Sequence, residues 1–154
     1  MSRWKMVSKV GPKVAALALP LLFGASGCHE YKYVNVPVSF DQASFDDSQI
    51  GVIHSCRVTV SGADSDSFNL QNCPDTSKSD PHDVGTFEFS TFADSGTLKF
   101  EVRTYTGLNQ TDQCQTGLGS VTVPVTSATT IMAGNLIIAK TGPGCANNVA
   151  DGGQ

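Results

Sequence analysis

The sequence is poor in basic residues and in tryptophan. Its 154 residues include ten Lys or Arg against fourteen Asp or Glu, and four of the basic residues stand within the first 13 positions. From residue 28 onward, six basic and fourteen acidic residues remain, which gives a net charge near −8. This balance excludes the basic surface that nucleic-acid binding requires. Trp4 is the single tryptophan, so a carbohydrate-binding surface built on indole rings is disfavoured.

Catalytic and redox motifs are also missing. The chain contains no G-x-S-x-G, no H-E-x-x-H, no glycine-rich phosphate loop after a predicted strand and no C-x-x-C. We therefore predict a protein that is not an enzyme and that needs no cofactor. The alternative is a small hydrolase in which His82, beside Asp80 and Asp83, acts as a general base.

The N-terminal region has the organisation of a secretory signal peptide. Arg3, Lys5, Lys9 and Lys13 precede the apolar run VAALALPLLFGASGC at residues 14–28, and no acidic residue occurs in this region. The run is shorter than the roughly 20 apolar residues that a membrane-spanning helix needs. An uncleaved transmembrane anchor is therefore the weakest alternative.

The end of this run, Ala25-Ser26-Gly27-Cys28, resembles the lipobox of bacterial lipoproteins, in which Leu is usual at the position of Ala25. The resemblance implies cleavage before Cys28 and attachment of a diacylglyceryl group and an N-acyl chain to that cysteine. His29 stands where an Asp usually retains such proteins in the inner membrane, which implies the outer membrane. The alternative is ordinary signal-peptidase cleavage at the same bond, without lipid. We expect a cleaved signal peptide at residues 1–27, a lipidated tether at 28–30, one domain at 31–140 and a flexible tail at 141–154.

Cysteine usage fits an exported protein. Of the five cysteines, a lipid on Cys28 leaves an even four for disulfides. Three connectivities are open, and closeness in sequence favours Cys56 with Cys73 and Cys114 with Cys145, the second of which would pin the tail. The first bond requires a bulge or curl, because Cys73 falls on the opposite parity to Cys56 in the predicted strands.

Two metal sites can be drawn from the side chains, and neither is favoured. A zinc site of His54, Cys56, Cys73 and His82 matches no standard ligand spacing. Calcium prefers oxygen ligands, and aspartates crowd two loops, but no D-x-D-x-D-G loop occurs. We therefore expect no metal, with a calcium-dependent adhesin as an alternative function that would use Asp64, Asp66, Asp75, Asp80 and Asp83.

Hydrophobic alternation predicts an all-β domain. Val34, Val36 and Val38 alternate with polar or prolyl residues, as in a half-buried strand, and Pro37 indicates the edge of a sheet. Gly134 indicates a bulge in the last strand. No stretch after residue 28 shows sustained helical periodicity. Seven short strands predict an antiparallel two-sheet sandwich of immunoglobulin-like or fibronectin-like type; we expect them at residues 31–40, 50–60, around 68, 84–92, 97–105, 121–125 and 131–139.

The turns between these strands predict two hairpins. The turn GADSD would place Val60 opposite Phe68, and ADSG would join residues 84–92 to residues 97–105. Residues 106–119 are rich in Gly, Gln and Thr and predict a long loop.

Outward aromatic side chains are the candidate binding surface. The alternation places Tyr31, Tyr33, Phe92 and Tyr105 on outer faces, where the alternative role is packing against neighbouring strands or the tether. We expect a non-catalytic binding or structural module of the cell envelope. Lipid on Cys28 would hold it to the membrane, and its partner would be an envelope protein or a glycan.

Overall fold

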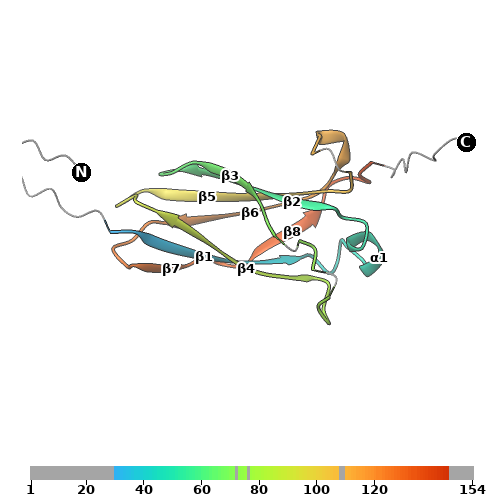
Figure 1. Cartoon of the computed structure of the whole chain (residues 1–154), viewed down its shortest axis with the longest axis horizontal. Helices are drawn as coiled ribbons and strands as arrows, with labels where there is room; N and C mark the ends of the chain where they lie inside the picture. The colour runs from blue at the N-terminus through green and yellow to red at the C-terminus, as the bar shows by residue number, and fades with distance from the viewer. Residues whose placement is uncertain (1–29, 72, 76, 108–109, 146–154) are drawn as a thin grey trace, which may run out of the picture.

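The computed structural model describes residues 30–145 except residues 72, 76 and 108–109. The predicted all-β class is confirmed (Figure 1). Within this part of the chain the elements are β1 (Lys32–Phe40), α1 (Asp47–Ile50), β2 (Ser55–Gly62), β3 (Asp66–Asn69), β4 (Asp83–Thr91), β5 (Thr97–Tyr105), the 3-10 turn η1 (Asp112–Cys114), β6 (Gln115–Pro124), β7 (Thr130–Met132) and β8 (Leu136–Lys140).

The strands form one curled sheet. Hydrogen-bonded neighbours follow the order β3-β2-β5-β6-β8-β1-β4, and β7 pairs with β1 beside this path. Curling brings the two halves of the sheet face to face (Figure 1). The ring centroid of Phe100 on β5 lies 5.8 Å from that of Phe87 and 5.6 Å from that of Phe89, both on β4. The two ends of the path also approach each other, since the rings of Phe68 on β3 and Phe87 lie 5.8 Å apart. The result is a half-barrel whose open side is filled by side chains.

The space between the two halves is filled by aliphatic and aromatic side chains. Inward positions alternate along β1, β2 and β5, as the sequence pattern predicts for half-buried strands. Burying each such side chain contributes about 1.5–3 kcal/mol to folding before the entropy cost is subtracted. The most completely buried hydrophobic side chains are Val34, Val36, Val58, Leu98, Phe100, Val102, Leu136 and Ile138.

The sheet is mixed and not purely antiparallel, contrary to the prediction. β1 pairs in parallel with β7 and with β8, for example Val38 with Leu136. β8 pairs antiparallel with β6, through Leu118 and Ala139, and so joins the two halves into one sheet. Alternation along a strand is the same whichever way its neighbour runs, so the sequence pattern carries no information on this point.

The prediction that Pro37 marks a sheet edge is wrong, because β1 is paired on both sides. The Tyr33 N–H donates to the Thr129 carbonyl at 2.8 Å, and the Asn35 carbonyl accepts from the Ala133 N–H at 2.9 Å. Position 37 faces the same side of β1 as Tyr33 and Asn35, so a backbone N–H there would point toward the connection between β7 and β8. A proline is tolerated inside the sheet because the ladder is already interrupted there.

The interruption corresponds to the bulge predicted at Gly134. The parallel pairing advances from Asn35 with Met132 to Val38 with Leu136. An advance of three residues along β1 thus matches an advance of four residues from β7 to β8, so the segment between β7 and β8 contains one extra residue.

Residues 84–92 and 97–105 do not form the predicted hairpin. β4 pairs with β1, whereas β5 pairs with β2 and β6, so the chain crosses from one half of the sheet to the other between them. Alternation within each segment places Phe89 and Phe100 on the inward face, and this part of the prediction is correct, because both are buried. Two strands that face each other across a core show the same inward alternation as two strands that lie side by side.

The hairpin of β2 and β3 does form, with a different register. Phe68 pairs with Val58, and Val60 pairs with Asp66, so the strands are shifted by two residues from the predicted pairing of Val60 with Phe68. Gly62 ends β2 at φ 108°, a conformation that glycine adopts without steric cost.

The first part of the predicted strand 50–60 is a helical turn and a connection. Asp46 and Gln49 form a capping box, in which the Asp46 carboxylate accepts from the Gln49 N–H at 2.9 Å and the Gln49 side chain accepts from the Asp46 N–H at 3.2 Å. Alternation over residues 50–60 would place Val52 and His54 on the same face as Cys56, in the core, but both are exposed, while Ile53 is buried.

Residues 115–119 were expected to be loop and belong to β6. A Cβ on Gly117 would lie 2.7 Å from Thr104 Oγ1 and 2.9 Å from Phe45 Cζ. Glycine is therefore required here by the close approach of neighbouring elements. A glycine-rich segment that looks flexible in the sequence is part of the strand that closes the core.

Candidate functional site

The outer face of β1 carries exposed aromatic side chains at its N-terminal end. The strand alternates strictly, with Lys32 and Val34 buried and Tyr31 and Tyr33 exposed, at 47% and 38% of their surface. This alternation places Tyr31 and Tyr33 on one face, as the sequence predicts. β1 starts at one end of the domain, next to the first described residues (Figure 1).

Phe92 lies beside Tyr31 because the pairing of β1 with β4 brings these two segments together. Lys32 pairs with Thr91, so the next position outward sets Tyr31 next to Phe92. Their ring centroids are 3.8 Å apart at an interplanar angle of 38°, and Phe92 is 49% exposed. A hairpin of residues 84–92 with residues 97–105 would set Phe92 opposite Thr97, whereas in the structure Phe92 packs against Tyr31.

Met132 extends this surface, and sequence reasoning missed it. It is 67% exposed and pairs with Asn35 on the outer face of β1, diagonal to Tyr33. The alternation of buried Ile131 with Met132 was the available signal. We call Tyr31, Tyr33, Phe92 and Met132 the β1 patch.

Polar contacts beneath the β1 patch fix the turn that carries Phe92. The Lys32 ammonium is turned inward and donates to the Asp94 carbonyl at 3.2 Å, with the Asp94 carboxylate at 3.6 Å. The Thr91 hydroxyl donates to the Asp64 carboxylate at 2.8 Å and accepts from the Ala93 N–H at 3.1 Å. Phe92 is thus held between Thr91 on one side and Ala93 and Asp94 on the other, all of which make polar contacts.

Tyr105 does not belong to the candidate surface. It is 3% exposed, so its assignment as an outward aromatic is wrong. The pairing of β5 with β6 shifts between Thr104 and Tyr105, and both residues are buried. An irregularity of this kind breaks the alternation on which the prediction relied.

His82 is a contact between loops in this structure. Its Nε2 lies 3.0 Å from the Phe45 carbonyl oxygen, and its Nδ1 lies 3.4 Å from the Asp80 carboxylate and 3.7 Å from that of Asp47. A carbonyl oxygen can only accept, so Nε2 carries the proton and donates it. A general base needs a lone pair directed at a substrate. Here one ring nitrogen is occupied and the other faces carboxylates, an arrangement that ties the loop before β4 to residues 45–47.

An open depression lies beside His82. Its volume is about 320 Å³. The Ser39 hydroxyl within it accepts a hydrogen bond from the Asn135 amide at 3.1 Å. The depression is lined by Ser39, Phe40, Asp41, Gln42, Asp80, His82, Asp83 and Ile137.

The aspartates considered for calcium are used in local hydrogen bonds. Asp64 accepts from Thr91 and Ser65, and Asp66 accepts from Ser67. Two hydrogen bonds from Ser77, one from its hydroxyl and one from its N–H, hold the pKa of Asp75 below its usual range. Among residues 30–145, as far as the structure describes them, no three His, Cys, Asp or Glu side chains are grouped to hold a metal ion.

Asp80 and Asp83 also have partners within their own loop. The Asp80 carboxylate accepts from the His82 N–H at 2.9 Å, and the Asp83 carboxylate lies 3.4 Å from the Lys78 ammonium. These aspartates shape turns, which is the ordinary role of this residue type in loops.

The cysteines are joined as neighbours in sequence, Cys56 with Cys73 and Cys114 with Cys145. Cys56 and Cys73 are both buried, and as a disulfide they offer no thiolate for zinc. The zinc hypothesis therefore fails in this form of the protein.

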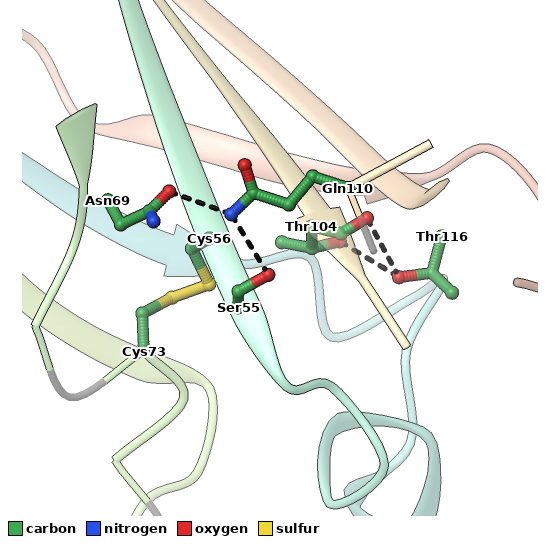
Figure 2. The surroundings of a disulfide bond; sticks show 7 residues. All are labelled: Ser55, Cys56, Asn69, Cys73, Thr104, Gln110 and Thr116. Atoms are coloured by element: carbon green, nitrogen blue, oxygen red, sulfur yellow. Dashed lines mark hydrogen bonds between the residues drawn. A yellow bond between two sulfur atoms is a disulfide. The ribbon is translucent and has the colours of Figure 1, made fainter. Parts of the chain in front are cut away.

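A hydrogen-bonded group surrounds the first disulfide (Figure 2). The Gln110 amide donates to the Asn69 side chain at 2.8 Å and to the Ser55 hydroxyl at 3.3 Å, which ties the loop after β5 to β2 and β3. The hydroxyls of Thr104 and Thr116 lie 2.9 Å apart in the interior.

The end of the described chain is attached to the domain through Cys145. Cys145 is bonded to Cys114, and its carbonyl accepts from the Thr106 hydroxyl at 3.1 Å. The predicted pinning of the tail at Cys145 thus has a structural counterpart, whereas residues 146–154 lie outside the described residues.

The proposed lipid-bearing residue, Cys28, and the predicted signal peptide lie outside the described residues. No helix within the described residues is long and apolar enough to cross a membrane. Comparison of the chain with known proteins gave no matching family model, no matching curated protein and no matching solved structure.

Proposed function

We propose that this chain is a lipoprotein of the cell envelope, held to the outer membrane by lipid on Cys28, and that its domain is a non-catalytic module that binds an envelope protein or a glycan. The observation that carries the proposal is the apolar run at residues 14–28 ending in Ala-Ser-Gly-Cys, with four basic residues ahead of it. Lipid on Cys28 leaves four cysteines, and the structure joins these four in two bonds.

The character of the surface also supports a binding role over catalysis. The exposed aromatic side chains of the β1 patch are gathered in one place, which is typical of an interaction surface. The ring nitrogens of His82, the only base considered for hydrolysis, contact the Phe45 carbonyl and two carboxylates.

The proposal extends to the fold family. Two halves of the sheet that share one core support an immunoglobulin-like sandwich, and the parallel pairing of β1 with β8 weighs against a purely antiparallel one.

The test is the intact mass of the protein extracted with detergent from the membranes of a Gram-negative host that expresses the full chain. We expect the mass of residues 28–154 plus a diacylglyceryl group and one acyl chain, lower by four hydrogens than the reduced form. The Cys28→Ser variant should lose the lipid, and the Ser26→Ala variant, which keeps a small residue before the cysteine, should retain it. A protein that still bears Met1, or that carries no acyl group at Cys28, would overturn the proposal.

A further inference from the structure

We propose that the β1 patch is the surface through which the domain rests on the lipid headgroup region of the membrane that holds its anchor. This inference rests on the proposed lipidation of Cys28. It adds a second contact, made by the folded domain itself, to the contact made by the lipid.

The first argument is distance. Tyr31 follows Cys28 by three residues, and an extended chain spans at most about 3.6 Å per residue, so the two α-carbons are no more than about 11 Å apart. The polar layer on each side of a bilayer is about 6 Å thick. A lipid inserted at Cys28 therefore keeps the start of β1 close to the headgroups in every orientation of the domain.

The second argument is composition. Tyrosine is enriched at membrane interfaces because its ring is apolar and its hydroxyl is polar. Tyr31, Tyr33 and Phe92 are 47%, 38% and 49% exposed, and Met132 is 67% exposed. The outward neighbours of Tyr33 on the adjoining strands are Ser90 and Thr130, which carry no charge.

The third argument is charge. The chain from residue 28 onward has a net charge near −8, so attraction to anionic lipids does not hold the domain down. The Lys32 ammonium beside the patch is turned inward to Asp94, and the side chain of Glu30, the last residue of the predicted tether, is exposed. Apolar burial of the patch is then the interaction that favours contact with the membrane, while Glu30 stays in the aqueous layer.

This orientation exposes the far end of the domain. α1 and the chain after β8 lie at the opposite end from the start of β1 (Figure 1). The depression beside His82 borders Asp41 and Gln42, which precede α1. That end is left free to meet a partner outside the membrane.

A single tryptophan reporter tests the contact, because Trp4 lies within the predicted signal peptide and no tryptophan follows it. The lipidated Phe92→Trp and Met132→Trp variants are reconstituted into phosphatidylcholine–phosphatidylglycerol vesicles whose acyl chains are brominated. The matched control is Val52→Trp, because Val52 is 45% exposed and follows α1 at the far end. Far-ultraviolet circular dichroism and thermal unfolding establish that each variant is folded.

We expect a blue shift and strong bromine quenching for Phe92→Trp and Met132→Trp, and several-fold weaker quenching for Val52→Trp. Equal quenching of the three reporters in lipidated, vesicle-bound protein overturns the inference and leaves the proposed lipidation standing. Patch reporters that stay unquenched in lipidated, vesicle-bound protein also overturn it, and point to a protein partner for the patch instead. If the mass shows no lipid and no variant sediments with vesicles, the proposed function fails and this inference fails with it.

Discussion

Replacing Gly119 with alanine tests a close approach of β6 to β8. Gly119 lies on β6 opposite Val102 of β5. A Cβ at this position would lie 2.7 Å from Leu136 Cδ2 and 2.9 Å from the Ile137 carbonyl carbon, and it would also meet the Ile137 carbonyl oxygen. Two of these three atoms are backbone atoms of β8, which cannot move without disturbing its pairing with β1 and β6.

The cost follows from this geometry. Overpacking of a well-filled core costs about 1–3 kcal/mol, and for a domain of this size each kcal/mol corresponds to about 4 °C in Tm. We therefore expect Gly119→Ala to lower the Tm of the oxidised protein by about 4–12 °C. The measurement is thermal unfolding followed by circular dichroism.

Gly134 supplies the matched control. A Cβ there would meet only Val121 Cγ2, at 4.0 Å, and Gly→Ala at a compatible site stabilises by about 0.4–1 kcal/mol through the unfolded chain. Gly134→Ala should therefore melt at or slightly above the parent. If Gly119→Ala melts as high as Gly134→Ala, β8 does not pass against β6 as described, and the half-barrel arrangement is refuted.

Two further predictions concern the disulfides and one ion pair. The loops closed by the disulfides Cys56–Cys73 and Cys114–Cys145 span 17 and 31 residues. Replacing the first pair with alanines should lower the free energy of unfolding by about 3 kcal/mol, and replacing the second pair should lower it by about 4 kcal/mol. Urea unfolding at neutral pH measures this, and a loss below about 1 kcal/mol for either pair contradicts the loop-closure estimate. Partial burial raises the pKa of Glu101, but hydrogen bonds from Arg103 and Lys99 outweigh it and hold the net pKa below the usual range. The stabilisation from ionised Glu101 is therefore present above about pH 4.3 and is lost as the pH falls through the lower folded-state pKa. Glu101→Gln should be less stable than the parent at pH 7, with the gap closing in acid; urea midpoints from pH 2 to pH 7 measure this, and a gap that does not change with pH speaks against the ion pair.

Much of the secondary structure could be read from the sequence. The alternation around Val34 and around Phe100 is strong, because each strand has one buried and one outer face. The errors lie where the chain departs from that pattern. Residues 47–50 are helical because of a capping box. Residues 115–119 belong to a strand although they are rich in glycine, because neighbouring elements approach positions 117 and 119 too closely for any other residue. The capping box is a local signal, carried by Asp46 and Gln49, whereas the close packing around the two glycines depends on distant segments and is absent from local propensity.

The candidate surface was partly predictable for the same reason. Tyr31, Tyr33 and Phe92 follow the outward parity of regular strands and are exposed. Tyr105 was misassigned because the ladder shifts beside it, and Met132 was missed although it alternates with buried Ile131. Gathering these side chains into one patch depends on the pairing of β1 with both β4 and β7.

The sequence by itself determined the all-β class, the inward and outward faces of most strands, and the expectation of a lipid-anchored, exported chain with an even set of cysteines for disulfides. These properties depend on composition and on periodicity along a single segment. Tertiary structure decided which strands are neighbours, that β1 is paired on both sides and runs parallel to β7 and β8, and that the ring of Phe92 packs against Tyr31. Those outcomes depend on how distant segments fill a shared core, and a period-2 pattern is identical for a partner beside the strand and a partner across the core.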